Sequence, residues 1–222
     1  MTLRNTIAIV NPNSSVHVTD GIAQAVLRAH GASEPFTFLT LHDGPPGIVT
    51  QADVELASSR VRAWAASSAD RYGAVVVACF SDPGVAEAQA ASATPVIGLG
   101  EAGLRQAAAR GERVGVIAVA SVAIERHMRR WQRLGLAAHV AGERGLDVSV
   151  QASGDPEVAW HPMLKAAQRL IGEDGADVLL LGCAGMAGLA ARLEDTVGCP
   201  VVEPCAAAAS AALALATDVR PA

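Results

Sequence analysis

Two cysteines in similar settings are the residues of this chain best placed to do chemistry. Cys79 ends the apolar run Ala74-Val-Val-Val-Ala-Cys79, and Cys183 ends the run Val178-Leu-Leu-Leu-Gly-Cys183, 104 residues later. Each run is typical of a buried strand, and turn-forming or small residues follow each cysteine. We therefore expect each thiol at the C-terminal end of a strand. A single cysteine in such a strand can also be inert filler of the core, so the case for function depends on the repetition.

The residues after Cys79 predict a helix close to its sulfur. Ser81 or Asp82 can cap a helix, and Pro83 is typical of a first helical position. The unpaired N–H groups at a helix start favour thiolate over thiol, so we expect a pKa for Cys79 below the usual value of about 8.5. Asp82 is most simply a capping residue, although it is near enough to Cys79 to accept a hydrogen bond from an N–H group of a ligand.

A facing pair of thiols would suit the racemisation of a carbon acid. One thiolate removes a proton from one face of the carbon, and the opposite thiol returns a proton to the other face. Thiols suit general acid/base work because their pKa lies near the working pH. The negative charge that develops on the substrate needs hydrogen-bond donors, which backbone N–H groups following the cysteines can supply. We expect these donors at Phe80, Ser81, Ala184 and Gly185.

The surroundings of the two cysteines are also repeated, which indicates an internal duplication. Pro95 lies 16 residues after Cys79, and Pro200 lies 17 residues after Cys183. Similar apolar strands precede both, at 7–10 and at 114–117. One α/β unit used twice explains this long period. Two like lobes packed face to face are commonly related by a pseudo-twofold axis, which would bring the two thiols to opposite walls of one cleft.

The order of predicted elements gives the fold class. Strands and helices alternate along the chain, which implies parallel sheets with right-handed crossovers. We predict an α/β protein of two similar lobes, each a parallel sheet flanked by helices, with the active site in the cleft between them. The first lobe would comprise residues 1–97 and 206–222, and the second residues 98–205. The expected strands are at 6–10, 36–41, 74–79, 95–99, 113–119, 147–150, 176–183 and 200–203.

Polar residues after the first strand of each lobe are candidates for substrate binding. Asn13 and Ser14 follow the strand at 6–10, and Ser121 follows the strand at 113–119. Loops at the carboxyl ends of parallel strands are where open α/β sheets bind ligands. The alternative is that these side chains only cap the helices that follow them.

Composition narrows the class of partner and the compartment. The 222 residues include 17 basic and 22 acidic residues, and the net charge of −5 offers no basic surface for nucleic acid. No apolar run approaches the roughly 20 residues of a membrane span. We expect a cytoplasmic protein, whose four cysteines stay reduced, with a small-molecule substrate. No metal site is expected, because no cysteine pair has metal-ligand spacing, and we expect a homo-oligomer.

Five motifs in order resemble those of the hydantoin and allantoin racemases within the aspartate/glutamate racemase superfamily. They are Asn11-Pro-Asn-Ser, Ala78-Cys-Phe-Ser-Asp-Pro-Gly, Pro95-Val-Ile-Gly-Leu-Gly-Glu-Ala, Leu181-Gly-Cys-Ala-Gly-Met and Pro200-Val-Val-Glu-Pro. The resemblance extends from about residue 6 to residue 212. It implies a cofactor-independent racemase of 5-substituted hydantoins or allantoin, with Cys79 and Cys183 as the opposed pair.

Other functions stay open at the level of sequence. The amino-acid racemases of the superfamily carry Asn-Thr and Thr-His after their cysteines, where this chain has Phe80-Ser81 and Ala184-Gly185. An arylmalonate decarboxylase needs one cysteine only, whereas a maleate isomerase can use two. A non-catalytic two-lobed binder of a small molecule is the alternative from a different class of protein.

Overall fold

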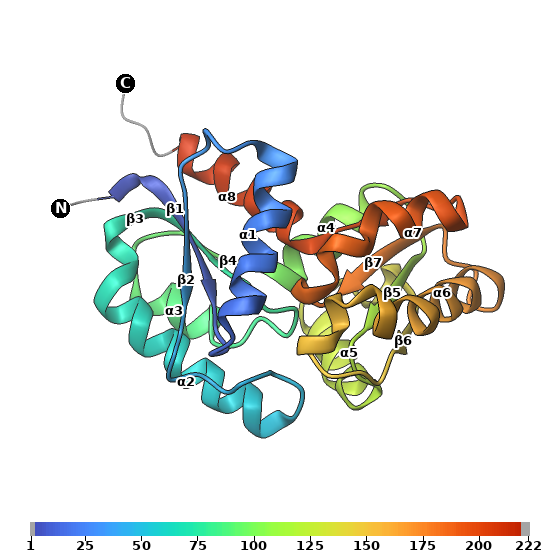
Figure 1. Cartoon of the computed structure of the whole chain (residues 1–222). Helices are drawn as coiled ribbons and strands as arrows, with labels where there is room; N and C mark the ends of the chain where they lie inside the picture. The colour runs from blue at the N-terminus through green and yellow to red at the C-terminus, as the bar shows by residue number, and fades with distance from the viewer. Residues whose placement is uncertain (1–2, 219–222) are drawn as a thin grey trace.

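The computed structural model describes residues 3–218 and consists of two α/β lobes side by side (Figure 1). The first lobe contains a four-stranded parallel sheet of β1 (Leu3–Asn11), β2 (Phe36–Thr40), β3 (Tyr72–Val77) and β4 (Val96–Gly98). The second contains a parallel sheet of β5 (Val114–Ala118), β6 (Val140–Gly145), β7 (Val178–Gly182) and β8 (Val201–Val202). The strand orders are β2-β1-β3-β4 and β6-β5-β7-β8, so corresponding strands occupy corresponding positions. The predicted fold class is confirmed.

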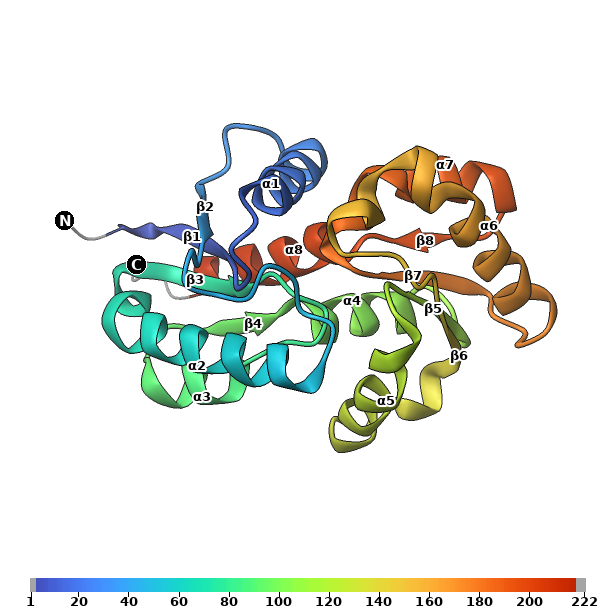
Figure 2. The same cartoon turned by 60° about the horizontal axis from the view of Figure 1, so that its bottom comes forward.

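Eight α-helices within the described residues flank the two sheets (Figures 1 and 2). They are α1 (Val16–His30), α2 (Gln51–Ser68), α3 (Val85–Ala91), α4 (Leu99–Ala108), α5 (Ile124–Arg133), α6 (Pro156–Gly172), α7 (Ala190–Val197) and α8 (Pro204–Asp218). A 3-10 segment, Ala184–Leu189, joins Cys183 to α7. None of the helices in this part of the chain is both long enough and apolar enough to cross a membrane.

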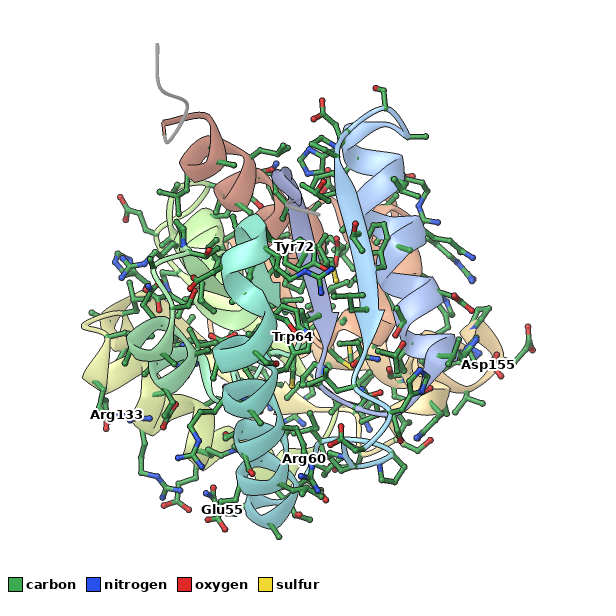
Figure 3. The ribbon with its side chains drawn as sticks, turned by 90° about the vertical axis from the view of Figure 1, so that its left-hand side faces the viewer. Glu55, Arg60, Trp64, Tyr72, Arg133 and Asp155 are labelled. Atoms are coloured by element: carbon green, nitrogen blue, oxygen red, sulfur yellow. The ribbon has the colours of Figure 1, made fainter. Side chains whose placement is uncertain are left out.

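Alternation along β1 explains how the first sheet is covered on both faces. Ile7 and Ile9 belong to a large apolar cluster that includes residues of α1, whereas Ala8 and Val10 belong to a second cluster under α2. A strand buried on both faces is apolar throughout, as in parallel sheets generally. Under α2, the ring of Trp64 stacks on Tyr72 with 6.1 Å between ring centroids (Figure 3).

Helices α4 and α8 join the lobes. Helix α4 packs against β7 and β8, whereas α8 packs against β1 and β3 and also against α4. The large apolar cluster runs through both helices and includes residues of both sheets. We propose on these contacts that residues 1–97 and 206–222 form the first lobe and residues 98–205 the second. Residues 1–2 and 219–222 of that division lie outside the described residues.

Two local predictions were wrong. The strand that pairs with β5 at one edge of the second sheet is β6, at Val140–Gly145, and not at 147–150. The prediction missed it because the partly buried, charged sequence of β6 lacks a strand-like apolar pattern. Helix α3 begins at Val85 and not at Pro83, after Gly84, which has a φ of +69° and provides no side-chain cap. A Cβ on Gly84 would lie 2.7 Å from the Ser58 carbonyl oxygen, so close packing against α2 requires glycine there.

Candidate active site

Both cysteines line one small cavity between the lobes. The cavity has a volume of about 30 Å³, and its walls come from the strand ends of both sheets. Cys79 lies two residues beyond the end of β3, and Cys183 directly follows β7. Because β3 and β7 hold equivalent positions in their sheets, the two thiols reach this cavity from corresponding places in the two lobes.

Four of the seven predicted substrate-binding residues line the cavity with the cysteines, namely Asn13, Phe80, Ser81 and Ala184. Ser14, Ser121 and Gly185 are not among the residues of its wall. The backbone N–H of Ser14 donates to the Pro45 carbonyl oxygen at 2.9 Å. Ser121 is hydrogen-bonded within the second lobe, because its N–H and its hydroxyl both donate to the Asp147 carboxylate, at 2.7 and 2.9 Å.

Asn13 is held in place by its neighbours in the turn after β1. Its carboxamide oxygen accepts from the Asn11 side chain at 3.0 Å and from the Ser15 N–H at 2.9 Å. The Nδ2 group is therefore the part of this buried side chain that can donate to a ligand. Capping of α1 is done by Ser15, whose hydroxyl accepts from the Val18 N–H, so Asn13 is not needed as the cap.

The protonation of Cys79 differs from the sequence prediction. Burial raises the pKa of its thiol to about 12, although a hydrogen bond from the Ser81 N–H and the charge of Arg126 lower it. Desolvation outweighs the expected field of a helix start, because α3 begins six residues further on and has only seven residues. The prediction of a lowered pKa at Cys79 was wrong. The side chain of Cys79 is partly exposed, and with its pKa raised this sulfur is a thiol at neutral pH.

Cys183 is also protonated, and it has more partners. Burial raises the pKa of its thiol, against the effect of the contact with the Ser153 side chain and of hydrogen bonds from the N–H groups of Gly185 and Met186. The Ser153 hydroxyl lies 3.6 Å from the sulfur. Gly185 therefore acts on the sulfur rather than on the cavity wall, and Ser153 is a partner that the sequence did not reveal.

Asp82 connects the Cys79 loop to the second lobe. Its carboxylate accepts from the N–H groups of Gly100 and Glu101 at 2.7 and 2.9 Å, so it caps α4 and not α3. It also accepts from Arg130 of α5 at 2.7 Å. Burial raises the pKa of Asp82 to about 6, with Arg130 and the two N–H groups acting in the opposite direction. Gly98 lets the carboxylate approach, because a Cβ there would lie 2.4 Å from its Cγ.

Comparisons with known proteins agree with this arrangement. A family model described as Asp/Glu/Hydantoin racemase matches residues 7–212. The chain belongs to this racemase family. Among curated relatives, a hydantoin racemase of Rhizobium meliloti is 31% identical over 94% of this chain and 88% of its own length. A hydantoin racemase of Paenarthrobacter aurescens is 30% identical over 94% of this chain and 90% of its own length.

Solved structures place the same fold among the racemases of this family. Allantoin racemase from Klebsiella pneumoniae superimposes with a TM-score of 0.90 at 25% identity, covering 97% of this chain and 88% of that one. Allantoin racemase from Pseudomonas fluorescens gives a TM-score of 0.90 at 26% identity, over 96% of this chain and 91% of that one. Arylmalonate decarboxylase, at 21% identity and a TM-score of 0.63, shares the fold.

One further group at the cavity of this racemase-family chain was missed by sequence reasoning. The Ser81 hydroxyl lies 3.2 Å from Nε2 of His127, whose Nδ1 lies 2.6 Å from a Glu143 oxygen. His127 comes from α5 and Glu143 from β6, and neither has a counterpart in the repeated motifs. The sequence could have offered one signal, which is that His127 lies on the buried face of the amphipathic helix α5.

Proposed function

We propose that this protein is an isomerase, a cofactor-independent racemase that inverts the acidic ring carbon of 5-substituted hydantoins or allantoin. Cys79 and Cys183 would be its acid/base pair. The observation that supports this most is that two thiols from equivalent strand ends of the two lobes line one cavity. The names of the hydantoin and allantoin racemases among its relatives support the substrate class.

The proposed reaction needs one thiolate and one thiol at a time. The thiolate takes the ring proton from one face, and the opposite thiol gives its proton to the other face. The sulfur pair then holds the same number of protons with their positions exchanged, so the reverse reaction uses the same site. The two groups titrate as a coupled pair, because the charge of Cys183 raises the pKa of Cys79.

The surroundings supply the remaining functions. The Asn13 amide would orient the ring, and donors near Ser81 and Ala184 would stabilise the charge that develops on the ring oxygen. The apolar wall of Val18, Ile48 and Val150 would keep water from the reacting carbon. A homo-oligomeric state and a cytoplasmic location stay predictions from the sequence.

The test is incubation of the purified protein with an enantiopure 5-substituted hydantoin, and separately with allantoin, in deuterated water. Optical rotation should decay to zero, and deuterium should enter the ring carbon at a rate matching that decay. Correction for spontaneous racemisation comes from parallel samples without protein. If neither compound loses optical activity faster than in those samples, the proposed substrate class is wrong.

A further inference from the structure

A large groove adjoins the small cavity that both thiols line. It has a volume of about 810 Å³ and lies between α2, residues 81–87 and α5. Ser81 and His127 belong to the walls of both spaces, so the groove begins where the thiol cavity ends. The thiol cavity, at about 30 Å³, has no room for a substituent on a hydantoin ring. The groove offers that room.

Arginines of α5 dominate the charge of this groove. Its wall contains four of them, at the spacing of one helix face, and two acidic residues, namely Arg126, Arg129, Arg130, Arg133, Asp82 and Glu87. Arg130 pairs with Asp82 at 2.7 Å. Arg129 pairs with Glu125 on its own helix. Within the described part of the chain, no carboxylate lies within ion-pair distance of Arg126.

Arg126 is a half-buried cation beside the thiol cavity. Its Nη2 donates to the Val49 carbonyl oxygen at 3.0 Å. Burial lowers the pKa of its guanidinium, and the charges that act on it from a distance are those of Cys79, Arg129, Asp53 and Glu143. The attraction of the three acidic groups does not make up for the lost hydration, so a further anion would be favourable at this position.

A second space beside the thiol cavity is smaller and more balanced in charge. It has a volume of about 170 Å³ and shares Val18 and Val150 with the wall of the thiol cavity. Its wall contains Asp20 and Arg28, one charge of each sign, besides His17. Charge therefore distinguishes the two spaces, and an acidic group is favoured in the groove along α5.

We propose that the groove along α5 binds the substituent of the hydantoin ring, and that Arg126 makes it selective for a substituent that ends in a carboxylate. This inference rests on the proposed function, because the ring must lie between the two thiols. The Nη1 group of Arg126 has no hydrogen-bond partner among the described residues, so it can donate to the carboxylate. A hydrogen bond between two charged groups is about twice as strong as one between neutral groups.

The test compares two hydantoins, one with a carboxyethyl group at the ring carbon and one with a carbamoylethyl group. In the wild-type protein, kcat/KM should be about tenfold or more higher for the acid than for the amide. Arg126→Gln should bring this ratio to within about twofold of one. Loss of the bond to Val49 in this variant affects both compounds alike, so it does not alter the ratio. Arg62→Gln, at an exposed position of α2 outside the groove wall, is the matched control and should keep the wild-type ratio.

Equal kcat/KM values for the acid and the amide in the wild-type protein would overturn the inference and leave the racemase function intact. This comparison needs no variant, so it decides the matter even if Arg126→Gln does not fold. A preference for the acid that persists in Arg126→Gln would overturn the role assigned to Arg126.

Calorimetric titration separates this inference from the proposed function. The probe is the racemic mixture of each compound, whose composition racemisation leaves unchanged, so binding is measured without net reaction. The acid should bind about tenfold more tightly than the amide to the wild-type protein, and about equally to Arg126→Gln. That pattern without racemisation would support the groove and contradict the proposed function. Equal affinities in the wild-type protein would overturn the inference whether or not the protein racemises hydantoins.

Discussion

At the scale of single residues, the chemistry depends on two thiols that burial keeps protonated. The pKa of Cys79 rises to about 12, and that of Cys183 is raised as well. The local donors, Ser81 N–H at one sulfur and Gly185 N–H at the other, lower these pKa values without reversing the effect of burial. The form with one thiol and one thiolate is therefore a minor species at neutral pH.

The pH dependence of kcat/KM follows from this. Because both thiol pKa values lie above their usual range, the fraction of enzyme with one thiolate grows with pH throughout the neutral region. We expect kcat/KM to rise by up to tenfold per unit between about pH 6 and pH 9, without levelling off near the ordinary cysteine value of about 8.5. Initial rates of optical-rotation decay in constant-ionic-strength buffers measure this profile. A plateau that begins below about pH 9 would contradict the raised pKa values.

At the scale of elements, the loop after Cys79 is fixed by α4 rather than by the short helix α3. Asp82 has a φ of +46°, in the left-handed region, and this places its carboxylate over the first turn of α4. Gly100 allows the approach, because a Cβ there would lie 2.1 Å from the Phe80 carbonyl oxygen. The glycines of Pro95-Val-Ile-Gly-Leu-Gly-Glu are thus explained by packing around the loop that carries Cys79.

Asp82→Asn tests this connection. The variant keeps one acceptor oxygen but turns an amide N–H group toward donors, and it removes the charge that pairs with Arg130. We expect the free energy of unfolding to fall by about 2–3 kcal/mol, as for a buried charged hydrogen-bond centre. Urea unfolding followed by far-ultraviolet circular dichroism measures the change. Glu125→Gln, which breaks an exposed pair with Arg129, is the control and should change stability by less than about 0.5 kcal/mol.

Comparison of the predicted and observed elements shows which parts of the fold and the site could be predicted from the sequence. The repeated apolar runs predicted β3 and β7, and with them both thiols, because an internal duplication is visible in one sequence. The sequence of β6, Val140-Ala-Gly-Glu-Arg-Gly, resembles a loop, since its strand character comes from pairing with β5 and not from its residues. Glu143 lies on that strand. The Ser81–His127–Glu143 chain was therefore hidden for the same reason as the strand that supports it.

At the scale of the whole molecule, the cavity between the lobes is too small for the proposed substrate. A volume of about 30 Å³ accommodates about two water molecules, far less than a substituted hydantoin. The loop at 41–50 contributes Ile48 to the wall of the cavity. Two hydrogen bonds from the second lobe hold this loop: Gln151 Nε2 donates to the Pro46 carbonyl at 2.8 Å, and Arg126 Nη2 donates to that of Val49 at 3.0 Å. Binding of a ring of that size must enlarge the cavity, by movement of this loop or separation of the lobes.

Gln151→Ala removes one of these two bonds without touching the cavity wall. Weaker closure lowers the affinity for substrate by about the energy of one hydrogen bond, roughly 1 kcal/mol, so KM should rise about fivefold. The value of kcat should stay within about twofold, because the reacting groups are unchanged. Gln168→Ala, at an exposed position of α6, controls for loss of a glutamine. An unchanged KM for Gln151→Ala would show that the loop does not open between Pro46 and Gln151.

The claim on which the account depends is that the sulfurs of Cys79 and Cys183 attack opposite faces of one carbon. The most direct measurement is deuterium exchange of each pure enantiomer of a substrate by Cys79→Ser and by Cys183→Ser. We predict that neither variant racemises, and that one variant exchanges the ring proton of one enantiomer only while the other variant exchanges that of the opposite enantiomer. Racemisation at the wild-type rate by either variant, or exchange of the same enantiomer by both, would contradict the account.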